Sequence, residues 1–161
     1  EKDQIRFMML NRSNDVELDF DFDKVKEKTK DNPVFYVQYA YARVNSLLRT
    51  LNLNLLDNID LNESNTDFNE IEKKIIRKVF EWPKIIESSS RKFDLHKIPF
   101  YLYELSTLFH AYWSRGNEDQ NYKFIENKKI KRKEILIVIN LVAIVIQNGM
   151  KILGVSLPDK M

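Results

Sequence analysis

A chain of 161 residues is long enough for one domain with a substantial buried core, and 26 Lys and Arg against 24 Asp and Glu leave a net charge of only +2. Any polyanionic partner must therefore be met by local basic patches rather than by bulk charge. The absence of cysteine excludes disulfides, thiol nucleophiles and thiolate metal sites, and two histidines offer a metal few ligands.

The opening stretch, EKDQIRFMMLNRSNDVELDF, has neither an initiator Met nor the basic and apolar regions of a signal peptide. It is interpreted as the continuation of a longer chain. We expect a connector over residues 1–23 and a helical domain over 24–161. With only three glycines and four prolines, the body should consist of long helices joined by a few loops.

Asn32 followed by Pro33 is typical of a helix start, and this helix is predicted to run to about Leu51. A loop rich in Asn and Asp is expected over 52–66. Apolar residues at helical spacing then predict a second helix from Phe68 to residue 82.

Two prolines, Pro83 and Pro99, are predicted to open the next two helices, the second of which is expected to end at Gly116. The last helix is predicted over 130–153 and is stopped by Gly154. No strand alternation is visible past residue 22. The sequence therefore predicts an all-α bundle of about five helices.

The most apolar run of the chain, Ile135 to Ile146, is interrupted by Asn140 and falls short of the roughly 18 to 20 residues of a membrane span. We therefore expect a soluble protein with no membrane partner.

Four aromatic residues fall within seven positions of the first long helix: Phe35, Tyr36, Tyr39 and Tyr41. At 100° per residue, Tyr36, Tyr39 and Arg43 lie within about 60° of arc. Two flat rings beside a guanidinium suit the stacking of an unpaired base. The same spacing also fits amphipathic core tyrosines whose hydroxyls reach the surface, and composition does not decide between these interpretations.

Several segments resemble one family. DNPVFYVQYAYAR, from residue 31, resembles the N-P-x-Y-Y-V-Q-Y-A-H-A-R stretch that opens the anticodon-binding domain of arginyl-tRNA synthetases. YLYELSTLFHAYW resembles that family's Y-L-Y-E-L-x-x-x-F-H-x-F-Y helix, and the end of the chain, IQNGMKILGVSLPDKM, is similar to its closing N-G-L-x-L-L-G-V-x-x-P-x-x-M. IRFMMLNRSNDVELDFDF looks like the end of its catalytic region. The resemblance implies a class I synthetase anticodon-binding bundle with a short extension from the catalytic region.

The resemblance also implies site residues. Tyr36, Tyr39 and Arg43 match the family residues that help to form a pocket for splayed anticodon bases. Trp113 is a candidate aromatic support. Tyr41 stands where the family usually has histidine, and tyrosine does not titrate near neutral pH, so no role is carried over to it.

Two further residues are implied to act near that pocket. Met161 matches the family's terminal Met, and its thioether is expected to pack against a base held over the tyrosines. Without the resemblance, a terminal residue would be expected to be disordered. Gln38 lies at a different azimuth, and we expect it to make a capping or interhelical hydrogen bond.

The run KKIKRK places five positive charges at a predicted helix start, where the helix dipole disfavours cations. A nearby phosphate would relieve this, so these residues are candidate contacts to a tRNA backbone: Lys128, Lys129, Lys131, Arg132 and Lys133. A solvated end placed for solubility is the alternative. His96 and His110 are expected to be a cap and a buried imidazole rather than metal or acid-base groups.

Neither an H-I-G-H-like nor a K-M-S-K-S-like motif occurs in the 161 residues, and no segment could form a nucleotide-binding α/β sheet. The resemblance thus implies that this chain holds no catalytic residue, metal or cofactor. It implies a parent arginine-tRNA ligase that uses ATP with Mg in the cytoplasm. The implied partners are tRNA(Arg) and a catalytic domain of the same polypeptide. A freestanding helical protein-interaction module is the alternative.

Overall fold

The structure, a computed structural model, describes residues 2–13, 29, 31–57 and 67–161. Its helices are α1 (Lys2–Leu10), α3 (Pro33–Thr50), α4 (Glu70–Phe80), α5 (Trp82–Lys92), α6 (Lys97–Glu118) and α7 (Lys133–Leu153). A short 3-10 helix, η1 (Gln120–Tyr122), and two antiparallel strands, β1 (Ile125–Glu126) and β2 (Lys129–Ile130), lie between α6 and α7. The expected all-α bundle is confirmed.

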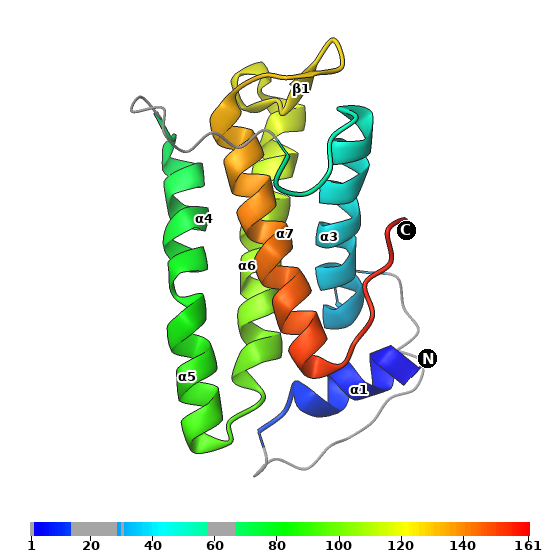
Figure 1. Ribbon diagram of the computed structural model, residues 1–161, viewed down its shortest axis with the longest axis vertical. Helices are drawn as coiled ribbons and strands as arrows, with labels where there is room; N and C mark the ends of the chain where they lie inside the picture. Colours follow the sequence, from blue (N-terminus) through cyan, green and yellow to red (C-terminus); the bar gives the residue numbers. More distant parts are fainter. Residues whose placement is uncertain (1, 14–28, 30, 58–66) are drawn as a thin grey trace.

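The long helices pack side by side, and α4 and α5 follow one another as a single column along α6 (Figure 1). Helix α7 contacts α3, α4 and α6, and α1 crosses the end of the bundle where α7 finishes (Figure 1). Phe7 of α1 is fully buried in the same core as α3 and α7. The expected domain boundary between residues 23 and 24, and residues 58–66 of the expected loop, lie outside the described residues.

Helix α3 starts where the sequence predicts, with Asn32 in extended backbone before Pro33. Its apolar residues recur every three or four positions and face the core, as Val34, Val37, Val44 and Leu48 do. The polar and aromatic positions between them are left at the rim of this face, where the candidate site lies.

Helix α6 corrects one prediction, because it continues through Gly116 to Glu118. Gly116 instead allows the backbone after α6 to pack closely against the helix. A Cβ atom there would lie 2.8 Å from the carbonyl oxygen of Tyr122, so a larger residue would push η1 away from the helix.

The segment before α7 corrects two more predictions. The helix begins at Lys133 rather than at residue 130, and residues 129–130 form a strand that the sequence analysis did not expect. Asn127 and Lys128 both have positive φ, 50° and 59°, as the two central residues of a tight hairpin turn require. Asn in that position was the available signal, but strands of two residues carry no alternation to detect.

Helix α7 also corrects the expectation that no segment approaches a membrane span. Residues Lys133–Leu153 are long and apolar enough to cross a membrane, by length and composition. In the fold, 61% of the most apolar window is buried against other helices. Its apolarity is therefore accounted for by its place in the core.

Gly154 ends α7 as predicted, and it does so in the left-handed conformation, with φ 65° and ψ 35°. We expect Gly154→Ala to lower the free energy of unfolding by about 1–2 kcal/mol, because a Cβ is strained in this region. Urea denaturation followed by circular dichroism measures the loss. Gly154→Asn should lose less, since Asn tolerates positive φ better. Equal stability of the wild type and the Ala variant would show that the turn relaxes without strain.

Candidate nucleic-acid interface

Tyr39 and Arg43 form the centre of the candidate site, one turn apart on α3 and both half-buried. The Arg43 Nη2 donates a hydrogen bond to the Tyr39 hydroxyl at 3.0 Å. The guanidinium carbon lies 4.2 Å from the centroid of the Tyr39 ring and 5.2 Å from that of Trp113 on α6. A cation is thus placed between two aromatic side chains, at distances where cation–π attraction operates.

His110 of α6 connects these residues to the start of α3. It is only 5% exposed, with Nδ1 2.9 Å from Arg43 Nη1 and Nε2 3.1 Å from the Tyr36 carbonyl oxygen. A guanidinium only donates and a carbonyl only accepts, so Nδ1 accepts and Nε2–H donates, which assigns the neutral tautomer. Burial, helped by the Arg43 charge, lowers the pKa of His110 to about 4. The buried imidazole expected at this position is confirmed.

The ring of Tyr36 packs against the imidazole of His110 and against the ring of Tyr103. Its ring centroid is 4.3 Å from that of His110 and 5.3 Å from that of Tyr103. The predicted stripe is therefore divided: Tyr39 and Arg43 touch directly, and Tyr36 is joined to them through His110.

A surface pocket of about 460 Å³ opens beside this group. Its lining residues come from α3, α6 and the end of the chain: Tyr39, Ala42, Arg43, Ser46, Arg49, Trp113, Lys160 and Met161. Three cationic side chains and two aromatic rings thus face one small volume. The structure brings four of the sequence-predicted residues together here, whereas Tyr36 is not among the lining residues.

The chain after α7 reaches this pocket because α3 holds it. The tail runs back along α3 from the end of α7 (Figure 1). Gln38 Nε2 donates to the Ser156 carbonyl at 2.9 Å, and Arg49 Nη1 donates to the Asp159 carbonyl at 2.8 Å. Gln38 therefore binds the tail rather than another helix. Met161, 51% exposed, lies at the pocket as a result.

Helix α1 holds the beginning of the same tail. Asp3 accepts hydrogen bonds from the backbone N–H of Ser156, at 3.1 Å, and from its hydroxyl. Arg6 Nη1 donates to the Gly154 carbonyl oxygen at 3.4 Å. Sequence reasoning missed these contacts because no local pattern links residues about 150 positions apart.

The basic run is divided by the fold, so the prediction that all of it lies at a helix start is wrong. Lys128 and Lys129 are exposed on the hairpin, Lys131 donates to the Gln120 carbonyl at 2.6 Å, and only Lys133 lies in α7. Arg132, the residue before α7, bonds inward to Glu72. The exposed lysines are the members of the run that face solvent.

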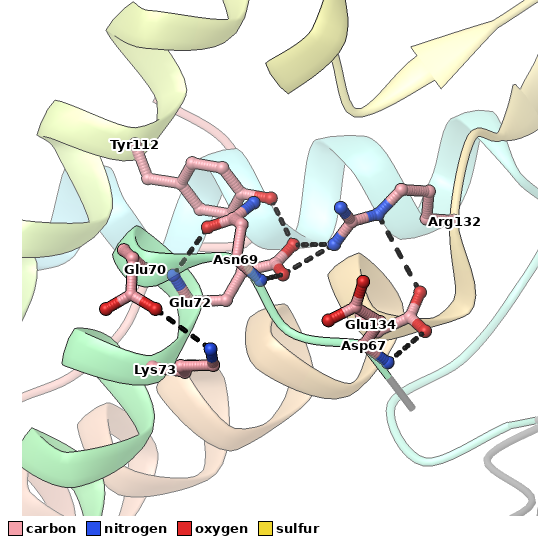
Figure 2. Close-up of polar contacts among 8 residues, drawn as sticks. All are labelled: Asp67, Asn69, Glu70, Glu72, Lys73, Tyr112, Arg132 and Glu134. Atoms are coloured by element: carbon pink, nitrogen blue, oxygen red, sulfur yellow. Dashed lines mark hydrogen bonds and ion pairs between the residues drawn. The ribbon is translucent and has the colours of Figure 1, made fainter. Parts of the chain in front are cut away.

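Arg132 belongs to a buried polar cluster that the sequence analysis missed (Figure 2). Glu72 of α4 is 0% exposed and accepts from Arg132 Nη2 at 2.6 and 2.5 Å and from the Tyr112 hydroxyl at 2.5 Å. It also accepts from the Asn69 backbone N–H at 2.8 Å, while the Asn69 side chain accepts from the Glu72 N–H. The Asn-x-x-Glu spacing of this capping box was a usable signal.

Within the described residues, no group of three or more His, Asp or Glu side chains is arranged to hold a metal ion. The pocket instead offers cations, rings and a thioether, a combination suited to a flat ring and a neighbouring anionic group. Fold and pocket together define a helical-bundle domain with a surface pocket lined by cations, aromatic rings and a thioether.

The chain belongs to the DALR anticodon binding domain family, which matches residues 37–161. It is 50% identical over 160 residues to an arginine–tRNA ligase from Pelagibacter ubique and 44% identical over 164 residues to one from Ruegeria pomeroyi. These alignments cover 99% of this chain and 28% of either relative, so the chain spans little more than a quarter of their length.

Solved structures share the fold. The arginyl-tRNA synthetase from Plasmodium falciparum matches with a TM-score of 0.78 and 21% identity, and that from Thermus thermophilus with 0.74 and 20%. Each match covers 99% of this chain and 26% of the other chain. In each of these synthetases, a fold like that of this chain therefore makes up about a quarter of a longer chain.

Proposed function

We propose that this chain binds the anticodon of tRNA(Arg) and positions the tRNA for ATP-dependent arginylation by a catalytic domain of the same polypeptide. The observation that carries the proposal is the pocket in which Tyr39, Arg43, Trp113 and Met161 converge. Membership in an anticodon-binding family supports the ligand class, and the arginine–tRNA ligases among the relatives support the tRNA and the reaction.

A splayed base entering the pocket would meet the Tyr39 and Trp113 side chains and the thioether of Met161. Arg43, already beside both rings, supplies positive charge where the base or its phosphate lies. Arg49 and Lys160 at the pocket, with Lys128 and Lys129 on the hairpin, are the cations assigned to the phosphate backbone.

The remaining candidates take supporting roles. Tyr36 acts through His110 rather than by lining the pocket. Arg132 forms an ion pair with Glu72, so its charge is already compensated within the protein. We assign no catalytic residue, metal or cofactor to this chain. The complete protein is an arginine-tRNA ligase that uses ATP with Mg and works in the cytoplasm. Family membership disfavours the alternative of a freestanding protein-interaction module.

Tyr39→Ala tests the proposal. In the complete protein, we expect it to weaken binding of a tRNA(Arg) transcript by about 5- to 150-fold, the equivalent of the ~1–3 kcal/mol that stacking of one base contributes. Fluorescence anisotropy measures the affinity. The matched control is Tyr122→Ala, which removes a half-buried ring that contacts Arg115 away from the pocket and should leave binding nearly unchanged.

A second transcript with its anticodon nucleotides replaced separates anticodon binding from general tRNA affinity. The wild type should bind it more weakly than the intact transcript, and the Tyr39→Ala variant should discriminate less between the two. Equal wild-type affinity for both transcripts would overturn the assignment of the pocket to the anticodon.

A further inference from the structure

Arg43 is held at two points by side chains of the protein itself. Its Nη1 donates to His110 and its Nη2 donates to the Tyr39 hydroxyl, at 2.9 and 3.0 Å. A guanidinium is planar and its N–H bonds lie in that plane, so two directional hydrogen bonds to its terminal nitrogens restrain the plane as well as the position of the group. An arginine anchored at only one nitrogen would retain rotational freedom that a ligand would have to remove on binding.

We infer that His110 is a positioning residue for the nucleic-acid site. The lone pair on its Nδ1 orients the Arg43 guanidinium between Tyr39 and Trp113. The inference rests on the proposed function, because it is the anticodon that Arg43 is assigned to meet. His110 itself does not line the pocket; it acts through Arg43.

The orientation of His110 is itself fixed. Its Nε2–H donates to the Tyr36 carbonyl oxygen at 3.1 Å, which leaves the Nδ1 lone pair directed at Arg43. The rings of Tyr36 and Tyr39 flank the imidazole at 4.3 and 5.5 Å between centroids. The same residue is buried, so the imidazole remains neutral and able to accept.

This arrangement also gives Tyr36 a function. The residue lies outside the pocket, yet its carbonyl accepts from His110 Nε2–H and its ring packs against the imidazole. Tyr36 on α3 therefore orients His110 on α6, and His110 in turn orients Arg43 on α3.

Two amide substitutions separate positioning from mere packing. In His110→Asn, the side-chain oxygen stands near the place of Nδ1 and can accept from Arg43, but the amide does not reach Tyr36. In His110→Gln, the terminal amide nitrogen stands near Nε2 and can donate to Tyr36, but no acceptor remains at the place of Nδ1. The two variants thus keep opposite halves of the network.

We expect His110→Gln to weaken binding of the intact tRNA(Arg) transcript to the complete protein by about 5- to 10-fold, and His110→Asn by about twofold or less. Arg43→Lys removes the planar group, so adding His110→Gln to it should cause little further loss, as in a double-mutant cycle between coupled residues. Thermal melting of every variant shows whether it folds. General misfolding caused by His110→Gln would add the same loss whether or not the Arg43→Lys substitution is present.

The outcomes distinguish this inference from the proposed function. Equal wild-type affinity for intact and anticodon-replaced transcripts overturns the proposed function itself. If the wild type discriminates and Tyr39→Ala weakens binding, but the Gln and Asn variants lose equally or the Gln variant binds like the wild type, the positioning role is wrong and the proposed function stands. Additive losses from His110→Gln and Arg43→Lys would likewise refute coupling between the two side chains.

Discussion

Glu72→Ala is expected to destabilise the fold by about 3 kcal/mol, because it removes a fully buried carboxylate from a buried hydroxyl, from a helix cap and from Arg132, whose side chain is 32% exposed. The substitution removes the only acceptor that Arg132 and the Tyr112 hydroxyl share in the cluster, and it removes half of the capping box of α4 (Figure 2). Tyr112 is fully buried, so its hydroxyl would be left without compensation from water. The free energy of unfolding, measured by urea denaturation, reports the loss.

Glu70→Ala supplies the matched control on the same turn of α4. Glu70 pairs with Lys73 at 2.8 Å, but their side chains are 81% and 45% exposed, so the pair should contribute little. We expect the Glu70 variant to unfold at nearly the wild-type urea concentration. Similar losses of unfolding free energy in the two variants would show that the burial of Glu72 does not determine how much it stabilises the fold.

The free energy of unfolding should fall by up to about 3 kcal/mol between pH 6.5 and pH 4 through His110 alone, since burial lowers the pKa of this group from 6.5 to about 4 in the fold. In that window the unfolded chain binds a proton that the folded chain does not, so stability decreases as pH falls. Well above pH 6.5 both states are neutral and the contribution of His110 is constant. The groups facing the imidazole are Arg43, Tyr36 and Tyr39 from α3 and Phe109 from its own helix.

Carboxylates also titrate at the acid end of this window, so the measured quantity is a difference. Chemical denaturation of the wild type and of His110→Asn across the pH range isolates the histidine, because Asn carries no proton to gain. The pH dependence of the variant should be shallower. His96→Asn is the control: it leaves His110 in place, so the steeper dependence should persist. Parallel curves for the wild type and His110→Asn would contradict the lowered pKa.

Local chemistry made the bundle and half of the site predictable. The Asn32–Pro33 start, the left-handed Gly154 and the one-turn spacing of Tyr39 and Arg43 are each decided within a few residues. The position of Met161 became an expectation only through resemblance to a family, since the hydrogen bonds that direct the tail are made by Gln38 and Arg49 more than 100 positions away.

Apart from the Asn69–Glu72 capping box, the side-chain partners that sequence reasoning missed are long-range. Arg43 and His110 are 67 residues apart, and Glu72 and Arg132 are 60 apart. The periodicity of apolar residues does not show which face of α6 contacts which face of α3. Helices with similar patterns can pack in several arrangements. Gly116 was misread for the same reason: its neighbour, the Tyr122 carbonyl, is a contact between segments rather than a helix-end signal.

The two tryptophans of the chain lie in different surroundings, and this has a spectroscopic consequence. Trp82, where α4 gives way to α5, packs 5.2 Å from the Tyr101 ring, whereas Trp113 lines the pocket beside Arg43. Intrinsic fluorescence therefore combines one emitter that reports the integrity of the bundle with another that reports occupancy of the pocket. Replacing Trp82 by Phe would leave Trp113 as the one tryptophan. With excitation selective for tryptophan, stacking of a base could then be followed as quenching without attaching any dye to the protein or the RNA.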